Sequence, residues 1–415
     1  MAGGAAILML KTVLGKPKDM WLILINWGNV YSMRDVYIIG CKGIPAKYGG
    51  YETFVDNLVR RQKSNGIKYH VACLNRPEAE GSYFGAECFS VRVPNIGPAK
   101  AVLYDLRALK ACIRFIEKSK TEKPIVYVLT CRIGPFFKRL VRKIHRLGGT
   151  VMLNPDGHEW LRAKWPKPVR WYWKRSERSM VRWSDLIICD SRNIQKYIDT
   201  EYSRFQPKTC FVPYGADICP SSVKDDDAVY LEWQKKWNVT PGSYYVSVGR
   251  FVPENNFEIM IREFMASKTK KDFVIITNVE QNKLYRSLEK KYRFTRDPRI
   301  KFVGTIYNPE LLKKIREDSF AYIHGHSVGG TNPSLLEALA STKVNILYDV
   351  GFNKECGAES SLYFTSEIGS LAQIIDDADT LSDERIAELQ TLAKDRIKAD
   401  YSWAKIVSDY EELFR

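Results

Sequence analysis

The chain contains 415 residues, of which 45% are hydrophobic and 27% are charged, a balance typical of a soluble globular protein with room for two domains. Its formal net charge of +16 indicates an anionic partner, which composition leaves open between nucleic acid, an acidic membrane surface and phosphorylated substrates. Nine scattered cysteines, never in a Cys-x-x-Cys pair, argue against a disulfide framework and a structural zinc site and favour a reducing compartment.

Residues 1–34 form an N-terminal extension in which the sequence predicts no convincing helix or strand. Its most apolar run, residues 21–27, is too short to span a bilayer, and no other stretch of the sequence is long and apolar enough to do so. Met33 lies just before the first clear strand, which favours a translation start there. An interfacial membrane anchor is the alternative.

From Asp35 onward, strand-like and helix-like segments alternate, which predicts βαβ units and largely parallel sheets. The first series predicts strands at 35–40, 68–74, 86–93, 124–129, 150–153, 185–189 and 209–212. The second series predicts strands at 243–248, 272–277, 299–303, 320–323, 344–347 and 361–364. We therefore expect an α/β fold of two Rossmann-like doubly wound domains, 35–213 and 214–400, facing a central cleft. A last helix at 401–415 is expected to pack back on the first domain.

The turn after the first strand is rich in glycine, with Gly43, Gly49 and Gly50. This spacing differs from the dinucleotide-binding fingerprint, so a nicotinamide cofactor is disfavoured. The adjacent pair Gly49 and Gly50 predicts a flexible loop tip over the cleft.

The stretch 324–340 has the pattern of a strand end, a glycine turn and a helix start. Gly329 and Gly330 allow a ligand to approach the backbone, and the free N–H groups of a helix that begins at Pro333 attract anions. The pattern predicts a diphosphate cradle, with Glu337 placed to accept hydrogen bonds from hydroxyl groups. An ordinary strand-to-helix turn is the alternative. Arg250, at the end of another strand, is predicted to bind the same diphosphate, with a surface ion pair as the alternative.

The loop 154–160 places two carboxylates and an imidazole at one strand end. Asp156 or Glu159 is predicted to act as a general base for an acceptor hydroxyl, and His158 to contact a sugar or phosphate. Simple turn chemistry is the alternative. None of the five histidines has metal-ligand spacing, so a metal site is not expected.

The segment 160–183 interleaves five tryptophans with lysines and arginines, and the preceding basic helix 136–147 is amphipathic. This pattern favours the surface of an anionic membrane, and Trp171, Trp173, Lys174 and Arg175 are the predicted contacts. Single-stranded nucleic acid and ordinary core packing are the alternatives.

Four motifs, at 43–53, 154–165, 248–256 and 324–340, together resemble the bacterial cell-wall and capsule rhamnosyltransferases of glycosyltransferase family 4. The resemblance implies a GT-B architecture and a metal-independent, cofactor-free transfer that retains the anomeric configuration. It implies dTDP-L-rhamnose as donor and a sugar linked through diphosphate to undecaprenol as acceptor. It places the protein peripherally on the inner face of the cytoplasmic membrane.

The chain departs from the broader family pattern at two positions. Gly329 stands where the family has the first of two glutamates, and Asn255 stands where a lysine usually accompanies Arg250. Both changes recur in the branch that the chain resembles, but they leave the identity of the donor sugar open. A UDP-hexose donor is one alternative. A non-catalytic basic protein that binds membrane or nucleic acid is another.

The motifs and the resemblance together define three sets of expected site residues. The catalytic set is Asp156, His158 and Glu159. The donor-binding set is Arg250, Asn255, His326, Gly329, Gly330, Thr331, Asn332 and Glu337. The acceptor-binding set is Gly43, Lys47, Tyr48, Gly49, Gly50 and Arg162. The acceptor sugar, the linkage and the oligomeric state are left open.

Overall fold

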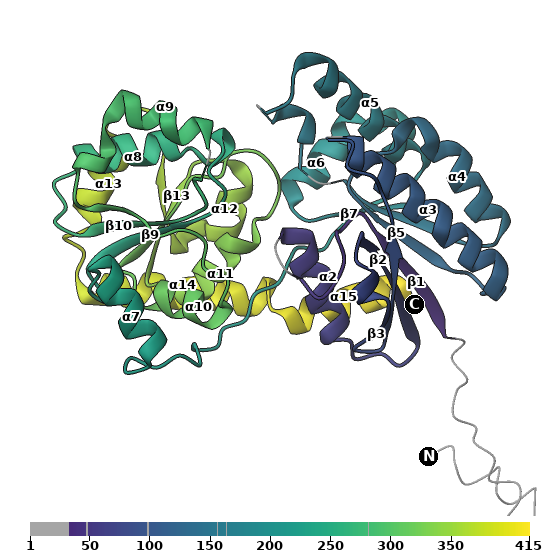
Figure 1. Cartoon of the computed structure of the whole chain (residues 1–415), viewed down its shortest axis with the longest axis horizontal. Coiled ribbons are helices and arrows are strands. Elements are labelled where there is room, and N and C mark those ends of the chain that lie inside the picture. The colour runs from purple at the N-terminus through teal and green to yellow at the C-terminus, as the bar shows by residue number, and fades with distance from the viewer. Residues whose placement is uncertain (1–32, 47–48, 98, 156, 163, 281) are drawn as a thin grey trace, which may run out of the picture. The chain divides into compact units, whose positions relative to one another are not determined.

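A computed structural model describes residues 33–46, 49–97, 99–155, 157–162, 164–280 and 282–415. Residues 34–415 form one compact unit that contains two parallel sheets (Figure 1). The N-terminal extension lies almost entirely outside the described residues, so the expectations for it stay open.

The first sheet has eight described strands in the order β3-β4-β2-β1-β5-β6-β7-β8, and only β3 runs antiparallel to its neighbour. Its strands are β1 (Arg34–Ile39), β2 (Ile67–Leu74), β3 (Gly81–Tyr83), β4 (Ala86–Val91), β5 (Ile125–Leu129), β6 (Thr150–Asn154), β7 (Leu186–Cys189) and β8 (Thr209–Phe211). Its helices are α2 (Gly50–Arg60), α3 (Ala99–Ser119), α4 (Gly134–Arg146), α5 (Lys167–Trp183) and α6 (Arg192–Glu201). Seven of the strands match the predicted ones, and the short edge strand β3 was missed.

The second sheet has six described strands in the order β11-β10-β9-β12-β13-β14, all parallel. Its strands are β9 (Tyr244–Val248), β10 (Asp272–Ile276), β11 (Ile300–Phe302), β12 (Ala321–His324), β13 (Val344–Tyr348) and β14 (Leu362–Phe364). Its helices are α7 (Ala228–Trp237), α8 (Phe257–Ala266), α9 (Lys283–Tyr292), α10 (Pro309–Glu317), α11 (Pro333–Ser341), α12 (Gly351–Gly357), α13 (Ser370–Ala378) and α14 (Asp383–Asp400). The sequence did not predict α7 and α12.

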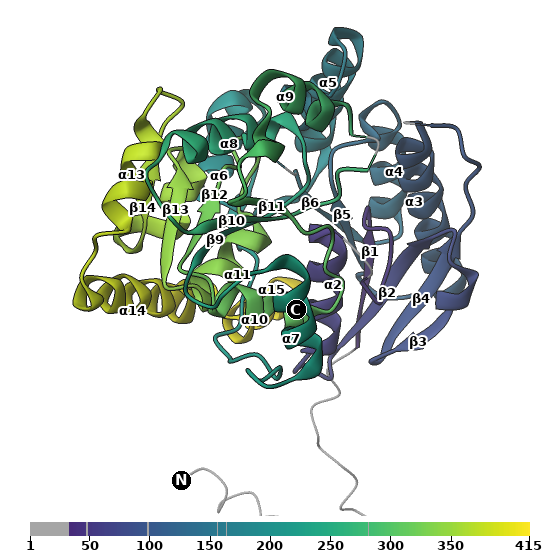
Figure 2. The same ribbon diagram turned by 60° about the vertical axis from the view of Figure 1, so that its left-hand side comes forward.

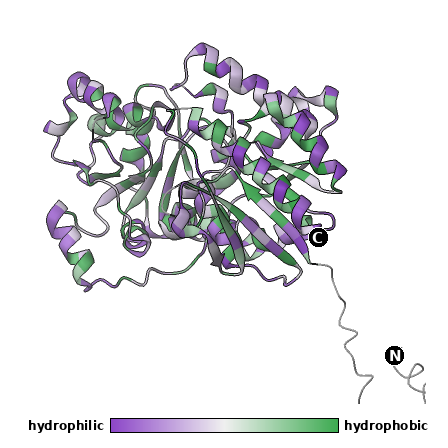
Figure 3. Cartoon of the chain, turned by 45° about the vertical axis from the view of Figure 1, so that its right-hand side comes forward, coloured by the Kyte–Doolittle hydropathy of each residue, from purple (hydrophilic) through white to green (hydrophobic). Residues whose placement is uncertain are grey.

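Strand β1 shows why these sheets form layers between helices. Successive side chains of a strand point to opposite faces, so Val36 and Ile38 enter one apolar cluster, which also contains residues of α2. Tyr37 and Ile39 enter another cluster, which contains residues of α3 and α4. All four side chains are buried, as expected for a central strand of a parallel sheet covered on both faces. Figure 3 shows that the outer helices carry both hydrophobic and hydrophilic residues.

The chain passes from one sheet to the other twice, and the two crossings lie side by side. The backbone N–H of Ala216 donates to the carbonyl of Tyr401 at 2.8 Å, and Ala216 forms a parallel bridge with Ser402. After the second crossing, α15 (Trp403–Phe414) packs on the first sheet, where the hydroxyls of Tyr410 and Tyr127 are 3.0 Å apart (Figure 2).

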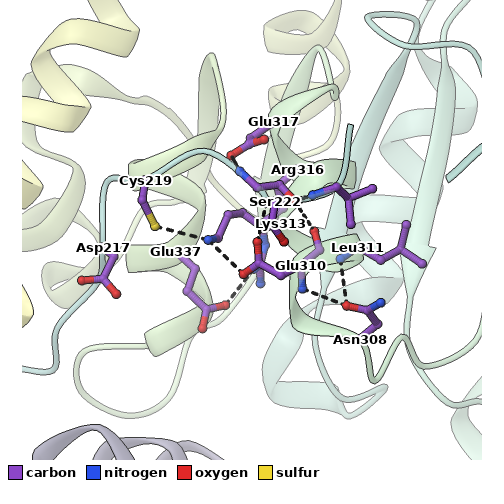
Figure 4. Close-up of polar contacts among 12 residues, drawn as sticks. Asp217, Cys219, Ser222, Asn308, Glu310, Leu311, Lys313, Arg316, Glu317 and Glu337 are labelled. Atoms are coloured by element: carbon purple, nitrogen blue, oxygen red, sulfur yellow. Dashed lines mark hydrogen bonds and ion pairs between the residues drawn. The ribbon is translucent and has the colours of Figure 1, made fainter. Parts of the chain in front are cut away.

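The first crossing continues along helix α10 before it enters α7. The backbone N–H of Ser222 donates to Glu310 at 2.7 Å, and the Lys313 ammonium lies between Glu310 and the Cys219 sulfur, at 3.2 and 3.3 Å (Figure 4). These contacts tie the connecting segment to the second sheet. Across the described ranges, no helix combines the length and apolarity needed to cross a bilayer.

Candidate functional site

A cavity of about 770 Å³ lies at the carboxyl ends of both parallel sheets. Residues that lie within three positions of strand ends in each sheet line it, as expected for ligand sites in open α/β sheets. They include Gly40, Arg132 and Asp190 after strands β1, β5 and β7, and Gly249, Thr277 and Gly325 after strands β9, β10 and β12. Two doubly wound sheets therefore share one cleft.

The predicted cradle forms the start of α11 and lines this cleft. Asn332 is the N-cap, since its side-chain oxygen accepts from the backbone N–H of Ser334 at 2.9 Å, and Pro333 occupies the first helical position. Gly329 has a φ of 144°, which a side chain rarely allows. The helix start faces the cleft with its positive dipole end.

A second helix start approaches the first across the cleft. Helix α2 begins at Gly50, where a β-carbon would lie 3.7 Å from Cγ of Pro333. Gly49 and Gly50 both line the cavity, as predicted for a loop over the cleft. Because both helix starts carry partial positive charge, the space between them favours an anion.

The glycines of the cradle also allow contact between loops of the two sheets. A β-carbon on Gly330 would lie 2.0 Å from Oδ1 of Asp190, and one on Gly157 would lie 2.2 Å from Cα of Gly329. The Thr331 hydroxyl donates to the backbone carbonyl of Asp190. These glycines therefore serve close packing between loops, a role that we did not predict.

Arg250 lies at the end of β9, is exposed and lines the cleft. Its loop is fixed by Asn255, whose side-chain N–H donates to the Arg250 carbonyl at 2.7 Å. The other end of the Asn255 amide meets Nδ1 of His326 at 2.7 Å. Burial, with help from Arg162 and Arg250, lowers the pKa of His326 to about 3, so its imidazole is neutral at pH 7.

Glu337 lines the cleft from α11, with 42% of its side chain exposed. Its Oε2 is 2.8 Å from Nη1 of Arg316, whose side chain is 4% exposed (Figure 4). Arg316 also donates to the Ser334 hydroxyl at 3.0 Å. A buried guanidinium therefore fixes the carboxylate that we predicted to accept hydrogen bonds from hydroxyl groups.

The loop after β6 carries the predicted catalytic residues, of which Asp156 lies outside the described residues. His158 adopts a φ of 46°, and its ring packs on Tyr197 with centroids 4.2 Å apart. Glu159 lines the cleft, with carboxylate oxygens 2.6 Å from Arg162 and 2.9 Å from Lys164. The catalytic role of these side chains stays a prediction.

The predicted acceptor residues divide between the cleft and the interior. Arg162, like Gly49 and Gly50, lines the cavity. Gly43 is buried, and a β-carbon there would lie 2.5 Å from the Cys73 sulfur, so the close approach of the neighbouring strand accounts for this glycine. Lys47 and Tyr48 lie outside the described residues.

The predicted membrane contacts on α5 separate into exposed and internal residues. Trp171 is 65% exposed, and the Arg175 guanidinium lies 5.4 Å from its ring centroid. Trp173 is 7% exposed and packs against Trp165, so its prediction as a surface residue is wrong. Two positions along a helix turn the side chain by about 200°, which directs Trp173 inward. Lys174 is held 2.9 Å from Glu201 and by the Tyr197 hydroxyl, so it is engaged within the protein.

Sequence reasoning missed several charged residues of the cleft, among them Arg132, Asp190 and Arg316. Asp190 directly follows β7, and Arg132 follows β5 after two residues. Both carried a usable signal, because a polar residue just beyond a buried strand of a parallel sheet points to the ligand edge. Arg316 carried none, since a single arginine on an amphipathic helix normally faces solvent.

Within the described part of the chain, no three His, Cys, Asp or Glu side chains gather in a way that could hold a metal ion. The expectation of metal-independent, cofactor-free chemistry stays a prediction.

Comparison with solved structures identifies the fold. The chain is similar to sucrose-phosphate synthase from Thermosynechococcus elongatus, with a TM-score of 0.75 and 15% identity over 92% of this chain and 98% of that one. It is also similar to Anabaena HepE in complex with UDP, at a TM-score of 0.66 and 12% identity over 92% and 99% of the chains. The fold is GT-B. This confirms the predicted fold class.

The GT-B likeness extends to a glycosyltransferase from Rickettsia africae, at a TM-score of 0.67 and 11% identity over 92% of this chain and 98% of that one. Residues 33–217 match a family model described as a domain of unknown function, DUF1972. That match includes every strand of the first sheet. No curated protein sequence matches the chain.

Proposed function

We propose that the protein is a glycosyltransferase that uses a nucleotide-sugar donor. One observation carries the proposal: the start of α11, the arginine at 250 and the carboxylate of Glu337 all line one cleft of a GT-B fold. Helix-start amides and a guanidinium suit a diphosphate, and a carboxylate suits hydroxyl groups. A protein that only binds a membrane has no use for this arrangement inside a cleft.

The chemistry follows from where negative charge develops. When the bond between the anomeric carbon and the diphosphate breaks, charge grows on the leaving phosphate oxygen. We propose that the amides of the cradle and Arg250 stabilise that charge without a metal. We propose retention of configuration by attack on the same face, with the departing phosphate oxygen helping to take the acceptor proton.

The finer proposal is transfer of L-rhamnose from dTDP-L-rhamnose to a sugar linked through diphosphate to a lipid, in cell-wall or capsular polysaccharide synthesis. It rests on the resemblance of the four motifs, including Gly329 and Asn255. A UDP-hexose is the second candidate donor, since HepE, a structural neighbour, is described in complex with UDP.

We further propose peripheral binding to the inner face of the cytoplasmic membrane. Helix α4 supports this, because it buries Phe137, Val141 and Ile144 and exposes a basic face. The exposed residues of that helix are Pro135, Phe136, Lys138, Arg139, Arg142, Lys143, His145 and Arg146. Exposed Trp171 and Arg175 add to the surface. Basic helices with exposed aromatic rings bind anionic lipid surfaces.

The deciding experiment measures transfer of radiolabel from dTDP-L-rhamnose, UDP-glucose and UDP-galactose onto synthetic prenyl-diphosphate saccharides. We expect label transfer from dTDP-L-rhamnose with retained anomeric configuration, and loss of most transfer in Arg250→Ala. Transfer from a UDP-sugar alone would favour the second donor. No transfer, together with no stabilisation of the protein by dTDP or UDP, would overturn the proposal.

A further inference from the structure

The wall of the cleft formed by the first sheet carries cations that are not in the predicted donor-binding set. Lys42, Arg132 and Arg162 line the cavity after three neighbouring strands, in the sheet order β1, β5, β6. Lys164 lies on the same wall, 2.9 Å from Glu159. We call these four residues the basic wall.

Arg132 lies at the centre of the basic wall and is fixed from behind. Its Nη1 donates to the Gly40 carbonyl at 3.2 Å and to Oδ2 of Asp105 at 3.3 Å. The Asp105 side chain is 1% exposed, whereas that of Arg132 is 26% exposed. A buried carboxylate thus holds a guanidinium whose other side reaches the cleft.

The backbone that presents Arg132 is strained. Thr130 has a φ of 89°, which is very unusual for a β-branched side chain. Its backbone N–H donates to the Asn154 carbonyl at 2.9 Å, and its hydroxyl donates to Asp105 at 3.4 Å. Strain of this kind persists where surrounding contacts enforce it, and it gathers at binding and catalytic sites.

Three carboxylates line this half of the cleft, and Glu159, with 24% of its side chain exposed, pairs with Arg162 and Lys164. Glu52 and Asp190 also line it, but they are 8% and 5% exposed. Glu52 accepts from the backbone N–H of Lys42 at 2.7 Å, and Asp190 packs against the cradle glycines. The Lys42 residue and 42% of the Lys164 side chain are exposed. Four cations and three carboxylates thus line this wall, and two of the carboxylates are buried, so the exposed charge is mainly positive.

We propose that the basic wall is a second anion site, which binds a phosphoryl group of the acceptor through Arg132. It lies on the first sheet, opposite the cradle and Arg250 of the second sheet. In this proposal Arg250 binds the diphosphate of the donor and Arg132 binds the phosphoryl group of the acceptor. The inference rests on the proposed transferase function. The phosphoryl group belongs either to a lipid-linked diphosphate or to a soluble sugar phosphate.

The test compares Arg132→Gln with the matched variant Arg250→Gln in the full chain. Calorimetry measures the affinity for dTDP and UDP, and kinetics measure KM for three acceptors that share one sugar: a prenyl diphosphate ester, a soluble sugar phosphate and a neutral alkyl glycoside. We expect Arg132→Gln to raise KM for phosphorylated acceptors about tenfold to a hundredfold, with nucleotide affinity unchanged. Arg250→Gln is expected to weaken dTDP and UDP binding and to leave the acceptor KM unchanged. Arg132→Lys is expected to raise the acceptor KM less than Arg132→Gln does.

Three results keep the inference separate from the proposed function. If Arg132→Gln weakens dTDP binding as much as Arg250→Gln does, or leaves all acceptor KM values unchanged, the second anion site is refuted. If no acceptor reacts, binding of farnesyl diphosphate to the wild type with saturating dTDP or UDP, and its loss in Arg132→Gln, still tests the site. If Arg132→Gln raises KM more for the prenyl diphosphate ester than for the soluble sugar phosphate, the site binds a lipid-linked diphosphate. If KM rises equally for both, the site recognises a phosphoryl group whether or not a lipid is attached.

Discussion

A β-carbon on Gly157 would lie 2.2 Å from Cα of Gly329, so a loop of the first sheet rests directly on the cradle of the second. Neither position tolerates a side chain in this arrangement. The contact joins the loop that carries the predicted catalytic residues to the loop that is predicted to bind the donor.

Replacing Gly157 with alanine is expected to hold these loops apart. Because the cradle itself stays intact, we expect dTDP or UDP affinity within about threefold of wild type and a transfer rate lower by more than tenfold, since a misplacement of 1 Å costs about a hundredfold. Calorimetry and initial rates measure the two quantities. Normal turnover in Gly157→Ala would show that the contact is dispensable.

Glu337 and Arg316 allow a test of hydroxyl recognition. If Glu337 accepts from donor hydroxyls, Glu337→Ala weakens nucleotide binding about tenfold to a hundredfold. The same variant no longer distinguishes UDP from 2′,3′-dideoxy-UDP, whereas the wild type does. Arg316→Lys keeps the positive charge but removes the planar guanidinium, so we expect it to weaken nucleotide binding less than Glu337→Ala does. Full discrimination by Glu337→Ala would contradict this role.

The two tryptophans of α5 give a matched pair for the membrane proposal. Trp171→Ala with Arg175→Ala removes exposed groups, so we expect weaker partitioning onto anionic vesicles and an unchanged melting temperature. Trp173→Ala empties a buried site and is expected to cost about 3–5 kcal/mol of unfolding free energy. Sedimentation with phosphatidylglycerol vesicles and thermal melts separate the two effects. Undiminished partitioning of the double variant would point to another surface.

Asp105 predicts a dependence of stability on pH. Burial raises the pKa of Asp105 to about 6 although Arg132 opposes the rise, from a value of 3.8 in the absence of the fold. Between pH 4 and 6 the folded protein therefore holds a proton that the unfolded chain has released. The folding free energy becomes less favourable by about 3 kcal/mol as pH rises through this window.

Urea unfolding of the wild type and Asp105→Asn at pH 4, 5, 6 and 7 measures this effect. The difference in unfolding free energy between the two proteins is expected to change across that range. Asp297→Asn is the control, because Arg299 lowers the pKa of Asp297 and its contribution changes only at lower pH. Parallel pH profiles for the wild type and Asp105→Asn would contradict the prediction.

The sequence predicted the architecture because short apolar runs and helix-start signals are local properties that tertiary contacts here reinforce. The apolar run around Val36 and the capping pattern at Asn332 are examples. Helix α12 was missed, since its seven residues are too few for a periodic signal. The cradle was found because glycine and proline mark a helix start wherever it occurs.

Pairings between distant segments were beyond the reach of sequence patterns. The ion pair of Arg132 with Asp105 joins residues from different elements, and nothing local marks either as a partner. Trp173 was assigned to the surface because composition describes a whole segment, whereas burial depends on the direction of each side chain. The contact of Gly330 with Asp190 likewise arises only when two sheets meet.

The paired crossings at Ala216 and Ser402 are expected to limit how the two sheets move. Because the two connections are bonded to each other, we expect them to act as one short pivot about which the sheets rotate without sliding past one another. Opening and closing of the cleft are then expected to follow one rotation. A ligand that contacts both walls is expected to restrict this rotation. Distance probes on opposite rims of the cleft would then report a narrower range of distances when the ligand is bound.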